Sequence, residues 1–486
     1  MATTKKPLDL TPLLELVGQP CGELHLFDMM SRWRTLVALA GEASWDRAAG
    51  QWLPALQRHL DEDWPDALRV WPHAWLRRKH PPAAQRVVRH LLLGEQSEAA
   101  HRAMFERLGE ATADAMPPLR MLSIHRGQKV ARRAPVSDLS PADAAALVRA
   151  LGHTPLCRLR LSGPTRAFWD ALLGSALPAR LEHLDLALGV NDDLGVEEEL
   201  GLAEALLAAA SALRSIKLSW QWRRGARYSD ALVEQLVRHA PTLADVEFVA
   251  DLDEPAHLAA LCAADWPALT TLKLGGRAPQ PLDAIHGLLQ RALRLHTLDL
   301  QALAGASAGV LPPRASAPPA SLRRLTIALD GTDPDALAAL LASPELAGLT
   351  SLRAPQPPPH AALWHAVCAL PLEQLTIVCN PHQYDGGAPQ LDALLERPIA
   401  TLRHLGTPCD DLDKLARLEL PALRSLNVQC LRFDEAAMQA LAASPLVARL
   451  DAPVGLTMTY EAVRHTPYTD GARLERFAPP ISARIV

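Results

Sequence analysis

One six-residue pattern constrains this chain more than any other feature. The pattern is L-x-x-L-x-L, with apolar residues at its first, fourth and sixth positions. In residues 156–161 (LCRLRL), the fourth and sixth residues fall on one face of an extended chain, and Arg158 and Arg160 fall on the other. The hexad therefore predicts a short β-strand with one buried and one outward face.

The hexad recurs, giving fourteen copies along the chain. Their apolar positions are Leu119/Leu122/Ile124, Leu156/Leu159/Leu161, Leu181/Leu184/Leu186, Leu213/Ile216/Leu218, Leu243/Val246/Phe248, Leu269/Leu272/Leu274, Leu295/Leu298/Leu300, Leu322/Leu325/Ile327, Leu349/Leu352/Ala354, Leu372/Leu375/Ile377, Leu402/Leu405/Thr407, Leu423/Leu426/Val428, Val447/Leu450/Ala452 and Leu474/Phe477/Pro479. The mean interval is about 27 residues, inside the period of roughly 20 to 29 that is typical of leucine-rich repeats. Residues 119–480 therefore resemble the leucine-rich-repeat family.

The resemblance is to the ribonuclease-inhibitor-like subclass, because helical segments separate the hexads. It implies an α/β solenoid in which parallel strands line the concave side and helices line the convex side. Helical segments are predicted at residues 197–213, 230–239, 334–341 and 434–441. The Asn or Cys that the family places three residues after the sixth position is mostly missing, with Asn380 the one good match. We therefore expect an irregular solenoid.

The N-terminal part of the chain lacks the run of hexads. Residues 1–115 show helical periodicity and hold six of the eleven Trp residues, so we predict a helical N-terminal domain there and a solenoid over residues 116–486. The domain either closes the open end of the solenoid, as terminal caps do, or forms a separate binding module with exposed aromatic residues. The sequence leaves both open.

Composition and charge indicate which class of partner and which cellular compartment to expect. The net charge of -5 gives no reason to expect a polyanion as the main partner, so nucleic acid is not expected. No apolar run is long enough for a membrane span. The first residues are not followed by the apolar region of a signal peptide, so none is expected. Seven scattered Cys suit a reducing compartment, and only seven of the 49 basic residues are Lys. We expect a cytoplasmic bacterial protein.

One irregular segment between hexads is the first choice for a contact site. Residues 220–228 (WQWRRGARY) supply Trp220, Trp222, Arg223, Arg224 and Tyr228. Trp, Tyr and Arg dominate binding hot spots because they combine a large contact area with directional polar groups. Alternatively, the aromatic side chains fold back onto the solenoid, and the sequence does not decide between the two.

The outward third and fifth hexad positions offer a second set of contact residues. From the second hexad to the eighth they are Arg158/Arg160, His183/Asp185, Ser215/Lys217, Asp245/Glu247, Thr271/Lys273, Thr297/Asp299 and Arg324/Thr326. Charges of both signs alternate, which suits a protein partner better than a nucleic-acid backbone. Arg158, Arg160, Asp185, Lys217 and Glu247 are therefore predicted partner-binding residues.

Motifs for catalysis and metal binding are weak. Cys379, Cys409 and Cys430 each follow a sixth position by two residues, but C-x-x-C pairs are absent, and we interpret these Cys as core residues. Ser307 lies in a G-x-S-x-G match, yet Pro residues follow it where the nucleophile elbow requires a helix. We therefore expect no catalytic residue, no cofactor and no bound metal.

These observations favour a non-enzymatic scaffold that binds another protein through a curved leucine-rich-repeat surface. Rigid presentation of a large surface would let side chains that are far apart in the sequence contact one partner at little ordering cost. The alternative is a regulatory inhibitor or sensor subunit that holds an effector or enzyme inactive.

Overall fold

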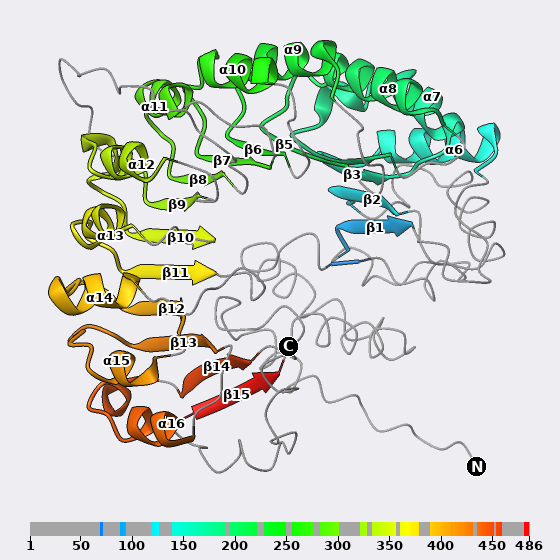
Figure 1. Cartoon of the computed structure of the whole chain (residues 1–486). Coiled ribbons are helices and arrows are strands. Elements are labelled where there is room, and N and C mark those ends of the chain that lie inside the picture. The colour runs from blue at the N-terminus through cyan, green and yellow to red at the C-terminus, as the bar shows by residue number, and fades with distance from the viewer. Residues whose placement is uncertain are drawn as a thin grey trace, which may run out of the picture. The chain divides into compact units, whose positions relative to one another are not determined.

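The computed structural model describes most of the repeat region. The described residues are 69–70, 88–93, 118–125, 139–189, 194–220, 228–248, 255–275, 282–300, 321–327, 333–355, 360–378, 389–409, 411–430, 435–451, 453–458 and 481–485. The chain divides into two compact units, Met1–Gln235 and Leu236–Val486, and the boundary falls within helix α9 (Asp230–His239). Figure 1 shows the described strands and helices of both units.

Strands alternate with helices in both units. Unit 1 contains β1 (His90–Leu93), β2 (Met121–His125), α6 (Pro141–Gly152), β3 (Arg158–Ser162), α7 (Arg166–Leu173), η6 (Pro178–Arg180), β4 (His183–Leu188), α8 (Val196–Ala209) and β5 (Ser215–Trp220). Unit 2 contains β6 (Asp245–Phe248), α10 (Pro255–Ala263), β7 (Thr271–Leu274), α11 (Leu282–Arg291), β8 (Thr297–Leu300), β9 (Arg324–Ile327), α12 (Pro334–Leu341), η7 (Pro344–Leu346), β10 (Ser351–Pro355), α13 (Ala361–Cys368), β11 (Gln374–Val378), α14 (Pro389–Glu396), β12 (His404–Pro408), α15 (Leu412–Ala416), β13 (Ser425–Cys430), α16 (Glu435–Ala442), η8 (Val447–Arg449), β14 (Val454–Met458) and β15 (Ile481–Ile485).

Within each unit the strands pair in parallel and in chain order, β1 to β5 in unit 1 and β6 to β15 in unit 2. The register aligns equal hexad positions from β2 onward: Leu159 lies opposite Leu184, and Leu161 opposite Leu186. Because side chains alternate with a period of two, this register places every fourth and sixth position on one face and every third and fifth on the other.

A repeated backbone arrangement fixes this register. The carbonyl of the second hexad residue accepts two N–H groups from the next repeat, so Cys157 O receives bonds of 2.8 and 3.0 Å from Glu182 and His183. Arg323 O likewise accepts bonds of 2.9 Å from Thr350 and Ser351. The arrangement recurs in both units, and it ties successive repeats from β1 to β5 and from β6 to β13 just before each strand begins.

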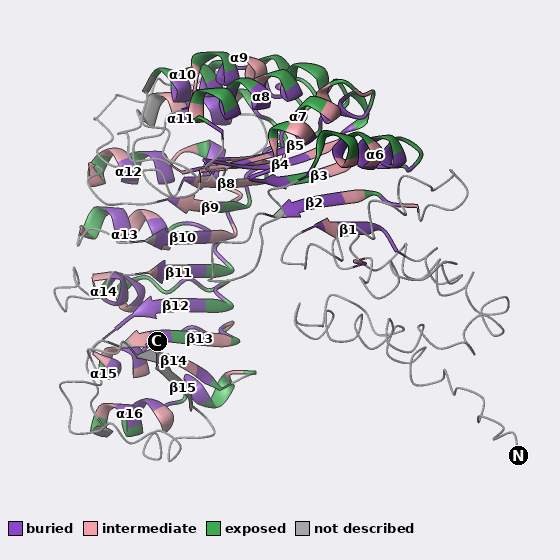
Figure 2. Cartoon of the chain, turned by 90° about the vertical axis from the view of Figure 1, so that its right-hand side faces the viewer, coloured by how far each residue is buried: buried purple, intermediate pink, exposed green. Residues whose placement is uncertain are grey.

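The core lies between the strands and the helices. Fourth and sixth positions are buried, as at Leu184 (2% exposed) and Leu186 (0%), and the helices place their buried residues toward the strands (Figure 2). Full burial of one Leu side chain stabilises the fold by about 1.5–3 kcal/mol. Since a single repeat has no second layer of its own, stacking with neighbouring repeats completes the core.

Most of the predicted strands are confirmed. The first twelve hexads each hold a strand that starts at the third position, from β2 to β13. The fourteenth predicted hexad, at Leu474, lies outside the described residues, and β15 begins after that segment at Ile481. The thirteenth prediction is wrong: Val447 begins the 3₁₀ helix η8, and β14 starts only at Val454. The apolar spacing at Val447 is therefore that of a helical turn.

One further strand precedes the first predicted hexad. β1 lies opposite β2 with His90 against Met121, so Val88, Leu91 and Leu93 take the apolar hexad positions. Val in place of the leading Leu concealed this copy in the sequence. Arg69 O accepts N–H bonds from both Arg89 and His90, which extends the backbone arrangement further toward the N-terminus.

The predicted helices are also present. α9 and α12 have the predicted bounds, and α16 differs from its prediction by one residue at each end. α8 ends at Ala209, four residues before the predicted end at Leu213, because Leu213 is buried as the first residue of the next hexad. The α/β leucine-rich-repeat solenoid predicted from the sequence is thus confirmed as the fold class.

Two other predictions concern parts of the chain that are not described. Most of the predicted helical domain, residues 1–115, and Asn380 lie outside the described residues. Among the helices that are described, none combines the length and the apolar character needed to cross a membrane.

Candidate functional site

The outward faces of the strands carry two rows of side chains. The third-position row of unit 1 contains Arg158, His183 and Ser215, and the fifth-position row contains Arg160, Asp185 and Lys217. In unit 2 the third-position row runs Asp245, Thr271, Thr297, Arg324, Ser351, Gln374, His404 and Ser425. The fifth-position row runs Glu247, Lys273, Asp299, Thr326, Arg353, Thr376, Gly406, Asn427 and Gly455. Residues remote in sequence thus become neighbours on one face.

Alternating charges in the fifth-position row form ion pairs between strands. Arg160 Nε lies 3.0 Å from Asp185 Oδ2, with the two side chains 48% and 27% exposed. Lys273 Nζ lies 3.2 Å from Glu247 Oε2 in unit 2. At this exposure such pairs contribute at most about 1 kcal/mol each to stability. They hold long side chains in place on the face without withdrawing them from solvent.

Two of the aromatic residues predicted as a hot spot, Trp220 and Tyr228, are described. Trp220 is the last residue of β5 and lies opposite Leu188, which is buried. Because side chains alternate along a strand, Trp220 belongs to the same face of β5 as the core-facing positions. Its ring centroid lies 5.6 Å from that of Tyr228, which is 3% exposed. These two residues pack against each other, as in the fold-back alternative. Trp222, Arg223 and Arg224 lie outside the described residues.

The structure therefore brings together only part of the predicted set. Arg158, Arg160, Asp185 and Lys217 lie on the adjacent strands β3 to β5, and Arg158 is partly buried with no described partner for its Nε. Glu247 belongs to unit 2. The outward residues of β10 to β13 were not among the predicted contacts, although the same third and fifth positions identify them.

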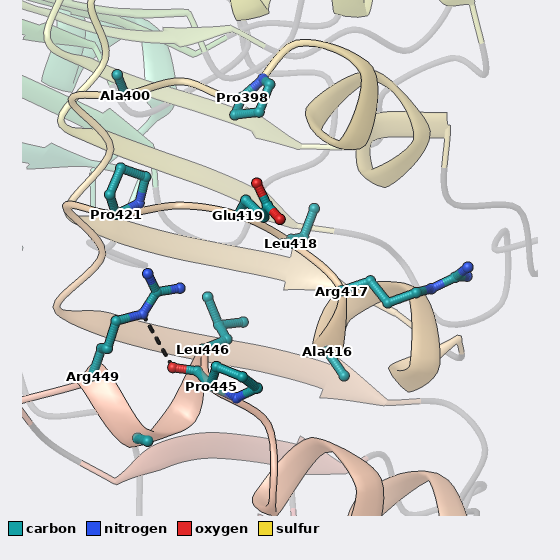
Figure 3. Close-up of a pocket in the computed structure, with 11 residues that line it drawn as sticks. Pro398, Ala400, Ala416, Arg417, Leu418, Glu419, Pro421, Pro445, Leu446 and Arg449 are labelled. Atoms are coloured by element: carbon teal, nitrogen blue, oxygen red, sulfur yellow. Dashed lines mark hydrogen bonds between the residues drawn. The ribbon is translucent and has the colours of Figure 1, made fainter.

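A groove of about 1070 Å³ lies in unit 2, away from these rows (Figure 3). It is lined by Pro398, Ala400, Ala416, Arg417, Leu418, Glu419, Pro421, Pro445, Leu446, Ala448 and Arg449, from the connections that enter β12, β13 and β14. Arg449 donates through Nε to Pro445 O at 3.1 Å. The exposed charges on the groove have both signs, so the lining does not select one class of ligand.

Of the Cys and Ser residues considered as candidates for catalysis or metal binding, Cys409 has a described side chain. Cys409 is buried and donates through Sγ to Asp411 O at 3.0 Å. Burial raises the pKa of the Cys368 thiol to about 11, with Arg397 opposing the shift, so this thiol is protonated at neutral pH. Within the described ranges, no group of three or more His, Cys, Asp or Glu residues could hold a metal ion. Ser307 and Cys379 lie outside those ranges.

Comparisons with known proteins add little to this geometry. No family model and no curated protein matches the chain. Among solved structures, the chain is similar to the crystal structure of the Rad7 and Elc1 complex in yeast, with 14% sequence identity and a TM-score of 0.39. The match covers 71% of this chain and 88% of that chain. We therefore derive function from the site itself.

Proposed function

We propose that the protein is a non-enzymatic scaffold that binds another protein across the outward rows of its strands. The observation that carries the proposal is the in-register alignment of polar, partly exposed third- and fifth-position side chains on neighbouring strands. Alignment of this kind gathers contact residues from many repeats onto one surface, as in other solenoid proteins.

Charge along the rows supports a protein partner over a nucleic acid. The fifth-position row alternates Arg160, Asp185 and Lys217 in unit 1, and Glu247, Lys273 and Asp299 in unit 2. A nucleic-acid backbone would require a continuous basic row, because its affinity comes from neutralising phosphates. Alternating signs instead suit a partner whose side chains carry the complementary pattern.

The backbone supports low-cost binding. Within each unit, from β1 to β5 and from β6 to β13, paired N–H bonds to one carbonyl fix each repeat to the next, so the strands hold the outward side chains at constant spacing. Neighbouring parallel strands lie about 4.8 Å apart. A surface that is already ordered loses little conformational freedom when a partner binds, which leaves more of the contact energy for affinity.

Two finer assignments belong to the same proposal. We place the repeats in the ribonuclease-inhibitor-like subclass, which is supported by helices of about eight or more residues between most of the strands. We also place the protein in the cytoplasm of a bacterium, which is supported by the scattered Cys and by the low share of Lys among the basic residues.

Affinity capture from the native lysate tests the proposal. The wild-type chain should retain a stoichiometric partner that a variant with Arg160→Glu and Lys217→Glu loses, because both substitutions reverse charges on the outward rows. Arg149→Glu is the control, since Arg149 is exposed on helix α6. Retention of the partner by the double variant, or its loss by the control, would contradict a site on the strand face.

A further inference from the structure

The outward face of unit 2 changes character along its strands. β6 to β8 carry three carboxylates, Asp245, Glu247 and Asp299, with one Lys between them. β9 to β13 carry no carboxylate at any third or fifth position. Their outward residues are Arg324, Thr326, Ser351, Arg353, Gln374, Thr376, His404, Gly406, Ser425 and Asn427. We call this second set the donor patch.

Two guanidinium groups give the donor patch its charge. Arg324 of β9 and Arg353 of β10 are exposed, and neither guanidinium group makes a hydrogen bond or ion pair with a described residue. Their strands are adjacent, with Arg324 opposite Ser351 and Arg353 opposite Thr326, so the two residues are diagonal neighbours. Arg160 and Lys273, by contrast, have carboxylate partners within the rows. Among the described residues, the positive charge of the donor patch is therefore not matched by a carboxylate.

Polar donors surround these two residues. His404 Nδ1 lies 2.8 Å from Ser425 Oγ, which orients the ring and leaves Nε2 without a described partner. Ser351 Oγ donates to Gln374 Oε1 at 3.4 Å. This bond uses the amide oxygen, so the two N–H groups of the Gln374 amide can donate to a ligand. Carboxylates accept hydrogen bonds from groups of this kind.

Gly406 leaves part of the donor patch without a side chain, on its fourth strand, β12. It occupies the fifth position of β12, where a Cβ would lie 3.3 Å from Thr376 Cγ2. With no side chain at this position, the main chain of a ligand can approach the sheet closely. Gly406 lies two strands from Arg353, a step of about 10 Å, which an extended peptide spans with about three residues.

We propose that the donor patch binds an acidic, extended segment of the protein partner. Its carboxylates would pair with Arg324 and Arg353, and its main chain would pass over Gly406. The inference rests on the proposed function and specifies the chemistry of the partner at β9 to β13. A nucleic acid is the competing ligand, but two Arg residues neutralise too few phosphates to make a strong site.

Fluorescence anisotropy with labelled twelve-residue peptides tests the inference directly. The peptides repeat Glu-Gly-Gly, Gln-Gly-Gly or Lys-Gly-Gly, and a twelve-nucleotide single strand serves as the polyphosphate probe. The Glu peptide should bind most tightly to the full chain. Arg324→Glu with Arg353→Glu should weaken it by at least about tenfold, since two charge pairs become repulsive. Gly406→Val should weaken it several-fold while retaining the thermal transition of the wild type.

A charge-matched control locates the site. Arg417→Glu with Arg449→Glu makes the same change of charge at the groove of unit 2 and should leave Glu-peptide binding unchanged. Loss of binding in the control alone, equal binding of all three peptides, or tighter binding of the oligonucleotide would overturn the inference.

Affinity capture from lysate distinguishes failure of the donor-patch inference from failure of the scaffold proposal. If the variant with Arg324→Glu and Arg353→Glu keeps the partner that the Arg160 and Lys217 variant loses, the scaffold stands and the donor-patch inference falls. If the wild-type chain retains no partner at all, the scaffold proposal itself fails.

Discussion

Glu199 illustrates how one buried residue supports a turn beside the outward face. Its side chain lies in the first turn of α8 and is 1% exposed. Oε2 accepts a 2.7 Å hydrogen bond from the N–H of Gly189, which has a φ of 73° in the turn after β4. Glycine adopts this backbone conformation without the steric cost that a side chain brings.

Replacement of Glu199 should therefore destabilise the fold. Glu199→Leu removes the acceptor and leaves a buried N–H unsatisfied, so the free energy of unfolding should fall by about 1–3 kcal/mol. Glu199→Gln keeps an acceptor and should cost less. Chemical denaturation measures both, with the exposed Glu197→Leu as the control. Equal stability of the two Leu variants would contradict the role assigned to this carboxylate.

Cys368 should show the chemistry of a protected thiol. Its pKa is raised to about 11 by burial, so little thiolate forms at pH 8. We expect native Cys368 to react with iodoacetamide much more slowly than the same residue in the denatured chain, as measured by mass spectrometry of its peptide. A native rate equal to the denatured rate would show that the thiol is not shielded.

The same shift gives a dependence of stability on pH. The unfolded thiol ionises near its ordinary pKa of 9.0, whereas the folded thiol ionises near 11. The contribution of the neutral thiol is therefore fully present below about pH 9 and is lost as the pH rises toward 11. Cys368→Ala should reduce this alkaline loss, which denaturation at pH 8 and pH 10.5 can measure.

At the scale of elements, the start of helix α12 could be predicted from the sequence because the residues that begin the helix are neighbours in the chain. Asp333 caps the helix by accepting from Asp335 N–H at 3.0 Å, and Pro334 occupies its first turn. η8 and β14 were misread because the L-x-x-L spacing of a strand hexad also fits a helical turn. Only the pairing of β14 with β13 resolves that ambiguity.

Core and outward positions of the neighbouring strands β9 and β10 should differ sharply in mutational cost. Leu352 of β10 is 1% exposed, whereas Thr326 of β9 lies on the outward row. Leu352→Ala should lower the free energy of unfolding by about 2–5 kcal/mol, and Thr326→Ala by less than about 0.5 kcal/mol. Thermal unfolding of both variants checks the expectation. Similar losses would mean that the outward row is structural rather than available for binding.

At the scale of the whole molecule, the sequence predicted the architecture because twelve repeats, from β2 to β13, carry the same signal. One hexad is ambiguous, but twelve that share a period predict a stack of strands and the faces they present. The site was less predictable. Arg160 and Asp185 were expected outward, yet their ion pair depends on the register of β3 and β4. The packing of Trp220 against Tyr228 was one of two alternatives, and aromatic composition alone could not reveal the side-chain direction of Trp220.

Site-specific photocrosslinking tests whether the partner binds the outward face of the strands. A photoreactive amino acid at Thr271, on the outward row of β7, should crosslink the partner in lysate, while the same group at the exposed Ala259 of α10 should not. A crosslink from Thr271 alone would place the partner on the strand face. A crosslink from Ala259, with none from Thr271, would place it on the helices and contradict the account.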